Sequence, residues 1–222
     1  MKIKDPSLRE KKFAKTKVVL MNTFMERLKN NRFENIGIKE ICREAEVSEA
    51  TFFNYFPEKI DVVRYFLQAV TQKVVWQVQQ DSPKGKFIPA VNNFFSLMAA
   101  ELKEDVLYQV FSVITSQDKM PEKTPISDSE MKLAFPDSKD VTVEKIYFID
   151  EFLEKLVKQA VLNGELPAKT KIDDLVISLM TIFAGTIVAV KFRSGMDRRA
   201  YHYERQLKTL WENFGAKQKG SR

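Results

Sequence analysis

A chain of 222 residues with a net charge of +6 can bury a substantial core, either as one large domain or as two small ones. Seven glycines and long amphipathic segments without alternating β-branched residues favour an all-α protein. The single cysteine, Cys42, excludes an internal disulfide and a multi-cysteine zinc site, and the single histidine, His202, excludes a histidine metal cluster. Glu-x-x-His pairs and phosphate-cradling glycine loops are also missing, so we expect no enzyme, no catalytic residue, no metal and no cofactor.

The charge is unevenly distributed, because residues 1–17 hold seven Lys or Arg against two acids. Such an arm is suited to tracking phosphates, although a solvated end is an equally good interpretation. The start of the chain lacks the long apolar core of a signal peptide, which predicts a cytoplasmic protein. The apolar run Leu175–Val190 is shorter than the roughly 20 residues that span a bilayer, so it predicts a buried or interfacial helix and no membrane partner.

In chain order, the first helix is predicted at about 14–30, and Asn30 or Asn31 is expected to end it in a left-handed cap. A second, short helix at 37–45 carries one apolar stripe that includes Cys42, which we interpret as a core residue.

A third helix should open at Ser48, whose hydroxyl can accept a hydrogen bond from the amide of Ala50 or Thr51. Phe52 and Phe56 lie four residues apart and share its buried face, and Pro57 ends it. The outer face then carries Glu49, Ala50, Thr51, Phe53 and Asn54.

Two short helices joined by so tight a turn form a helix-turn-helix. The run IKEICREAEVSEATFFNYFPEK, residues 38–59, resembles the TetR family of transcriptional regulators, and the match extends from Lys17 to Val63. Gly37 replaces the family's usual capping threonine, although Glu40 keeps half of a capping box. Glu46 replaces the usual turn glycine, so a left-handed backbone there would be strained by about 1 kcal/mol.

The resemblance implies that the third helix reads base edges while neighbouring cations hold phosphates. Asn54 can pair with adenine, although an exposed helical asparagine is also unremarkable, and Phe53 stands where the family often has a phosphate-binding tyrosine. The candidate DNA-contacting residues are Lys39, Ser48, Glu49, Ala50, Thr51, Phe53, Asn54, Tyr55 and Lys59.

The predicted division is a helix-turn-helix DNA-binding domain at 1–60 and a helical effector-binding and dimerisation domain at 61–222. A polar loop at 117–140, with one helical turn near Met131, is expected within the second domain. Its helices are predicted at 58–80, 87–102, 104–116, 141–163, 173–193 and 198–214.

The family further implies a homodimer that binds double-stranded DNA at an inverted repeat, acts as a repressor, and releases DNA when it binds a small-molecule effector. Aromatic and Met side chains at helical spacing are ordinarily core, but in this context they are also candidates for a mostly apolar effector pocket. The candidates are Trp76, Phe95, Met98, Tyr108, Phe111, Phe148, Phe152, Met180 and Phe183, with Tyr108, Gln109 or Thr181 as polar contacts.

The dimer contact is expected on the last two helices, at Ala184, Gly185, Leu207, Leu210, Trp211 and Phe214. An alternative function stays open, in which the helical chain acts through protein partners without specific DNA binding. Salt-sensitive binding to an inverted repeat distinguishes the two.

Overall fold

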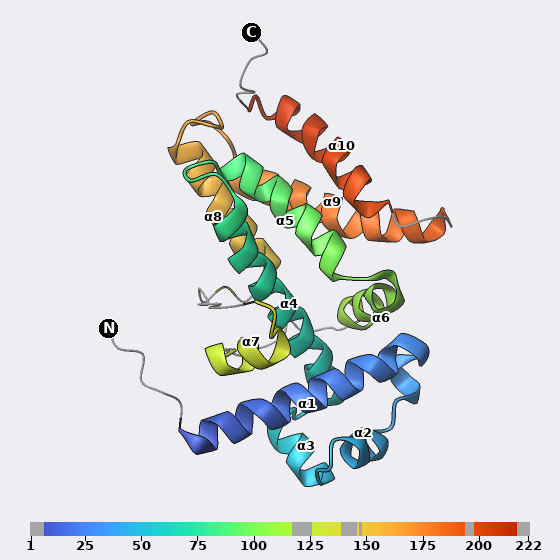
Figure 1. Cartoon of the computed structure of the whole chain (residues 1–222). Coiled ribbons are helices and arrows are strands. Elements are labelled where there is room, and N and C mark those ends of the chain that lie inside the picture. Colours follow the sequence, from blue (N-terminus) through green and yellow to red (C-terminus); the bar gives the residue numbers. More distant parts are fainter. Residues whose placement is uncertain (1–6, 117–125, 139–145, 147, 194–197, 217–222) are drawn as a thin grey trace. The chain divides into compact units, whose positions relative to one another are not determined.

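The structure, a computed structural model, describes residues 7–116, 126–138, 146, 148–193 and 198–216. Within these ranges it contains ten α-helices and no strand, which confirms the predicted all-α class (Figure 1). The helices fall into two compact units, and α4 (Lys59–Asp81) runs through both. The first unit combines residues 1–73 with 103–147, and the second combines 74–102 with 148–222.

In the first unit, α1 (Leu8–Asn30) is followed by the 3-10 turn η1 (Phe33–Asn35), and α2 (Ile38–Glu44) packs on both α1 and α3 (Glu49–Tyr55) (Figure 1). Leu20, Phe24 and Leu28 recur on one face of α1, and all three are fully buried. Burying each such side chain contributes about 1.5–3 kcal/mol.

Helix α1 ends at Asn30 as predicted, but its start and the conformation of its C-cap differ from the sequence prediction. Ser7 and Glu10 form a capping box, which starts the helix at Leu8 instead of residue 14. The predicted left-handed cap is wrong, because Asn31 is extended at φ −131° and its side-chain amide donates to the Arg27 carbonyl at 2.9 Å. The Arg27 carbonyl also accepts from the Asn31 backbone amide at 3.1 Å, so Asn31 closes the last turn twice without a left-handed residue.

The helices α6 (Glu104–Thr115) and α7 (Asp128–Ala134) also pack on α1, and therefore belong to the first unit. Val106, Val110 and Val113 of α6 enter the same core as Phe24 and Phe52. The compact units consequently do not coincide with the division expected at residue 60. That functional division stays a prediction, because compactness alone does not say which residues bind DNA.

The second unit contains α5 (Phe87–Glu101), α8 (Ile149–Leu162), α9 (Ile172–Phe192) and α10 (Arg199–Asn213). The helix predicted from residue 141 starts at Ile149, while residues 141–145 and 147 lie outside the described ranges. The first turn of α5 is capped from a distance, because the Glu165 carboxylate accepts hydrogen bonds from the amides of Phe87 and Ile88 at 3.0 Å each.

The core of the second unit is aromatic. The ring centroid of Phe95 lies 5.1 Å from that of Tyr203 and 5.8 Å from that of Phe183, and Phe94 lies 5.3 Å from Phe152. The Tyr203 hydroxyl also donates to the Phe183 carbonyl at 3.0 Å, which satisfies a buried polar atom. These contacts fix α5, α8, α9 and α10 against one another.

Helix α9 is longer than the apolar run Leu175–Val190 from which it was predicted. It has 21 residues and its most apolar window reaches a mean hydropathy of 2.1, so by length and composition alone it passes as a membrane-spanning helix. Length alone therefore does not separate a membrane span from a core helix. Only a third of its most apolar window is buried, which leaves an apolar face exposed on this helix.

Candidate nucleic-acid interface

The turn between α2 and α3 is tight and contains one left-handed residue. Glu46 has φ 54°, which confirms the strained backbone expected where a glycine is missing. The amide of Val47 donates to the Cys42 carbonyl at 2.9 Å and closes the turn. Cys42 is buried as predicted, and burial raises the pKa of its thiol.

Gly37 caps α2 with its backbone alone, as predicted. Glu40 does not complete a capping box there, because its carboxylate pairs with Arg27 of α1 at 3.1 Å. Arg27 also pairs with Glu44 at the other end of α2. These two ion pairs are exposed, so each adds little stability, but together they orient α2 on α1.

Helix α3 begins as predicted, because the Ser48 hydroxyl accepts a hydrogen bond from the amide of Thr51 at 3.1 Å. Phe52 is fully buried and anchors the helix in the hydrophobic core of the first unit. The Thr51 hydroxyl lies 2.8 Å from that of Ser48, and this contact holds both side chains at the start of the helix. The exposed face of α3 then presents Glu49, Ala50, Phe53 and Asn54.

The start of α1 lies beside the end of α3, which the sequence did not predict. The ring of Phe13 is 4.5 Å from that of Tyr55. Because the capping box at Ser7 extends α1 to Leu8, the cations in its first two turns are displayed on a helix and not on a loose arm. Those exposed cations are Arg9, Lys11, Lys12 and Lys15. The Ser-x-x-Glu spacing was the signal that could have revealed this.

The two predicted phosphate-binding lysines differ in their surroundings. Lys39 is exposed on the first turn of α2. Lys59 is half-buried, donates to the Glu34 carbonyl at 3.2 Å, and lies 4.6 Å from the centre of the Phe33 ring. Burial lowers the pKa of Lys59. A phosphate would have to compete with these contacts for Lys59 but not for Lys39.

Comparison with known proteins supports the fold only through solved structures, because neither a protein-family model nor a curated protein sequence matches the chain. A putative TetR-family regulator from Shewanella sp. PV-4 is 18% identical, with 91% of this chain and 99% of that one covered at a TM-score of 0.56. FadR from Thermus thermophilus, a TetR-family repressor in complex with lauroyl-CoA, is 18% identical, with 93% and 98% covered at 0.61. FadR from Bacillus subtilis, in complex with stearoyl-CoA, is 12% identical, with 86% and 96% covered at 0.60.

The chain has the TetR fold. These neighbours match nearly their whole length, so the likeness extends beyond the helix-turn-helix to the helices that follow it. At such low identity it establishes the architecture and no residue's role.

Within this TetR fold, the side chains predicted to line an effector pocket are divided between the units. Tyr108 and Phe111 of α6 are in the first unit, whereas the other seven are in the second. Phe95, Met98 and Phe152 are almost fully buried. Those three pack as core, while the half-buried members of the second unit are Trp76, Phe148 and Met180.

Two of the side chains predicted to make polar contacts with the effector, Gln109 and Thr181, bond to backbone carbonyls instead. The Gln109 amide donates to the carbonyls of Leu28 and Asn31 at the end of α1. Thr181 is exposed, and its hydroxyl donates to the Ile177 carbonyl one turn earlier on α9 at 2.8 Å. Neither side chain is therefore available to a ligand in the core of the second unit.

The residues predicted to form a dimer contact also separate into two groups. Leu207 and Trp211 are buried within the second unit, where α10 packs on α5 and α9, and the Trp211 indole donates to the Asn92 side chain at 2.8 Å. Their apolar stripe therefore has a partner within one chain, contrary to the expectation from the sequence. Gly185 is exposed, and Ala184, Leu210 and Phe214 are partly exposed.

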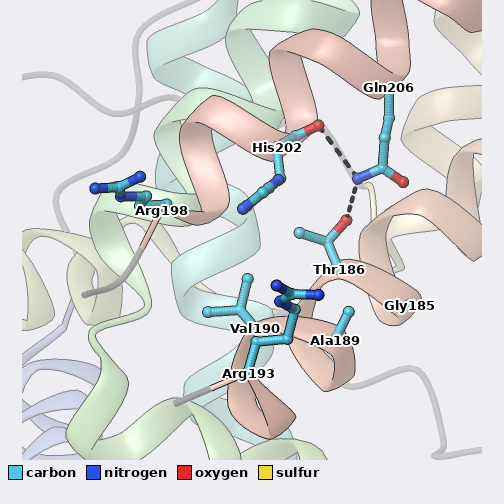
Figure 2. A pocket seen from close by; sticks show the side chains of 8 residues that line it. All are labelled: Gly185, Thr186, Ala189, Val190, Arg193, Arg198, His202 and Gln206. Carbon is cyan, nitrogen blue, oxygen red and sulfur yellow. Dashed lines mark hydrogen bonds between the residues drawn. The ribbon is translucent and has the colours of Figure 1, made fainter. Parts of the chain in front are cut away.

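A cavity of about 500 Å³ opens beside Gly185, between α9 and α10 (Figure 2). Gln206 spans it, because its side-chain amide donates to the Thr186 hydroxyl at 2.8 Å and to the His202 carbonyl at 3.2 Å. The remaining lining residues are Ala189, Val190, Arg193, Arg198 and the His202 side chain. The lining of this cavity therefore combines apolar side chains with the two arginines.

Proposed function

We propose that this chain is a DNA-binding transcriptional regulator, a homodimeric repressor that binds an inverted-repeat operator. The observation that carries the proposal is the exposed face of α3, held outward by the buried Phe52. Its side chains can donate and accept hydrogen bonds, and Phe53, 46% exposed, offers an apolar ring to a thymine methyl group. The TetR fold of the chain supports this assignment.

The charge around α3 fits the same partner. Exposed lysines and Arg9 on the first turns of α1, together with Lys39 on α2, are suited to contact phosphates on either side of a major groove. Among the described residues, the Phe13–Tyr55 ring contact joins the first of these cationic segments to α3. We propose a binding role and no catalysis.

Selection from a library of randomised duplexes tests the proposal for an operator of any sequence. The regulator should enrich an inverted repeat whose affinity falls steeply with salt concentration. The alternative, a helical module that acts through protein partners, should enrich no sequence and bind DNA only weakly. Enrichment of no sequence at low salt would contradict the proposal.

The homodimer is proposed on the exposed face of α9. Ile177, Val188 and Phe192 are 66%, 39% and 81% exposed, and they are spaced so that they share one side of the helix with Gly185. An apolar stripe of this length is unfavourable in water, and a second copy of the chain can cover it. Burial in a dimer also explains the hydropathy of α9 without a membrane, in keeping with a cytoplasmic protein.

Charges at the two ends of this stripe favour an antiparallel arrangement. Asp173 and Asp174 are exposed at the start of α9, whereas Arg193, the C-cap of α9, and Arg198 line the cavity at its other end (Figure 2). A two-fold axis near the middle of α9 would bring the acids of one copy toward the arginines of the other. Ala184 and Gly185 would then lie near the crossing point, where small side chains permit close approach.

A mostly apolar effector is proposed for the second unit, in which Trp76, Phe148 and Met180 are only half-buried. The two FadR proteins of the same fold were crystallised with acyl-CoA, which supports a ligand with a long apolar part. Such a ligand releases DNA only if it binds the DNA-free conformation more tightly than the DNA-bound one.

A further inference from the structure

Helix α6 contacts the C-terminal end of α1 and α7 contacts its middle, although both come after α5 in the chain. At the C-terminal end, the Gln109 amide of α6 donates to the carbonyl of Leu28 at 2.7 Å and to that of Asn31 at 2.8 Å. These carbonyls are at a helix end and have no partner within α1, so Gln109 satisfies both. The α6 side chain thus acts as the cap of α1.

Nearer the start of α1, a buried ion pair joins it to α7. The Lys17 ammonium and a Glu130 carboxylate oxygen are 3.1 Å apart. Lys17 is only 5% exposed and Glu130 only 4%. The Tyr65 hydroxyl of α4 donates to the same oxygen at 3.0 Å. Ser127 donates to the other oxygen from its hydroxyl at 2.6 Å and from its amide at 2.8 Å. The carboxylate is therefore fully hydrogen-bonded.

The electrostatics agree with a charged carboxylate at this position. Burial acts to raise the pKa of Glu130, but the Ser127 hydrogen bonds and the Lys17 charge outweigh it, and the pKa is lowered. Burial and the Glu130 charge together raise the pKa of Tyr65, so the phenol stays protonated and can donate.

Aromatic rings connect this ion pair to α3. The Lys17 ammonium lies 4.2 Å from the centre of the Tyr65 ring, 6.0 Å from that of Phe56 and 5.9 Å from that of Phe13. Phe56 is the C-cap of α3, and Phe13 contacts Tyr55 in its last turn. Lys17 therefore contacts Phe56 directly and reaches Tyr55 through Phe13.

Removal of α7 from this site would leave a buried ammonium without its carboxylate, which is strongly unfavourable. Lys17 would have to turn toward water, and the rings of Phe13 and Phe56 that surround it would repack. A buried ion pair enclosed by rings in this way favours two discrete arrangements and disfavours intermediate ones.

We propose that Glu130 is a positioning residue for DNA binding: α7 docked through Lys17 holds α3 in the orientation that fits the major groove. The inference rests on the proposed function and adds a regulatory part to it, because docking of α7 and binding of DNA then stabilise each other. By the reciprocity of linked equilibria, each must strengthen the other by the same factor.

Hydrogen exchange in the full-length wild-type chain tests this reciprocity. The amides of 128–134 should exchange about tenfold more slowly when the duplex enriched from the randomised library is bound. Unchanged exchange in α7 upon binding of that duplex would overturn the inference. A chain that enriches no duplex would instead contradict the proposed function, so the two failures are distinguishable. No variant is needed for this measurement.

Substitutions give a second readout. Glu130→Gln should weaken specific binding by about tenfold without altering the salt slope, because no phosphate contact is lost. The pair Lys17→Met with Glu130→Gln leaves no stranded charge and should restore much of the affinity. Asp128→Asn, on the exposed side of α7, is the matched control and should bind as the wild type does. Wild-type affinity in a folded Glu130→Gln variant would refute the positioning role.

Discussion

The sequence predicted the same phosphate-binding role for Lys39 and Lys59, but the structure gives the two side chains different surroundings. Lys39→Ala should lower the slope of log affinity against log salt concentration by about 1, because one phosphate contact disappears. Lys59→Ala should change the slope less, since its ammonium is already engaged by the Glu34 carbonyl. Titrations of the enriched duplex at several salt concentrations measure both slopes. Equal effects of the two substitutions would show that Lys59 leaves its site to contact DNA.

Asn54 tests a different kind of contact. Because its side chain is exposed on α3, Asn54→Ala should relax base preference at one position per half-site, at a cost of about 1–3 kcal/mol for the preferred base, with the salt slope unchanged. Repeated selection with the variant checks this. An unchanged consensus sequence would show that Asn54 contacts no base.

Tyr65 is expected to make the stability of the first unit fall at alkaline pH. Its pKa is raised in the folded chain above the ordinary 10.0, so as the pH rises above 10 the unfolded chain ionises first and becomes favoured. The stability contributed by the buried neutral phenol is present below pH 10 and is lost above it. Unfolding in urea between pH 8 and about 11 should show this loss in the wild type and a smaller one in Tyr65→Phe. Identical pH profiles would mean that Tyr65 ionises freely.

Helices whose ends carry local signals were predictable from the sequence. The Ser48 cap, the four-residue spacing of Phe52 and Phe56, and Pro57 together located α3, because each acts within one or two turns. The starts of α1 and α7 carry equally local signals, the capping boxes Ser7–Glu10 and Ser127–Glu130, which the sequence interpretation overlooked.

The partners of α6, α7 and α10 were not predictable. Glu130 is an ordinary surface residue by composition, and its burial follows only from the packing of α7 on α1 and α4. Leu207 and Trp211 formed a stripe whose partner could not be identified from the sequence, and the structure assigns that partner to α5 and α9 in the same chain. Such contacts join residues far apart in sequence, for which a single chain gives no signal.

The turn before α3 offers a test of backbone strain. Glu46→Gly should raise the free energy of unfolding by up to about 1 kcal/mol, because glycine adopts φ 54° without the clash of a Cβ, offset in part by its greater freedom when unfolded. Arg43→Gly, an exposed position inside α2, should instead lower stability by about 1 kcal/mol. Chemical denaturation compares the two. A destabilised Glu46→Gly variant would show that the residue at this turn is not strained.

The proposed dimer face can be tested without disturbing the core. Ile177→Asp on α9 should yield a folded monomer in sedimentation, because the side chain is 66% exposed within one chain. Leu162→Asp on α8, 79% exposed, is the matched control and should stay dimeric. A dimer that survives Ile177→Asp would move the interface away from α9. Charges at Leu207 or Trp211 would unfold the second unit and would not test the dimer.

If an effector releases the proposed regulator from DNA, ligand binding must be coupled to operator affinity. Lauroyl-CoA or stearoyl-CoA, the ligands of the FadR structures, should change the emission of Trp76 and lower operator affinity over the same concentration range. Coenzyme A without an acyl chain is the control and should do neither. An acyl-CoA that changes the emission but leaves DNA affinity unaltered would place the ligand in the chain without a role in release.

In the proposed dimer, two copies of α3 read two half-sites of one duplex. Hydroxyl-radical footprinting of the wild-type protein on the enriched duplex measures whether both half-sites are occupied. We expect two protected patches centred about one helical turn apart and related by the symmetry of the inverted repeat. Uniform weak protection along the duplex, or a single protected patch that persists at full occupancy, would contradict a dimeric operator-binding regulator.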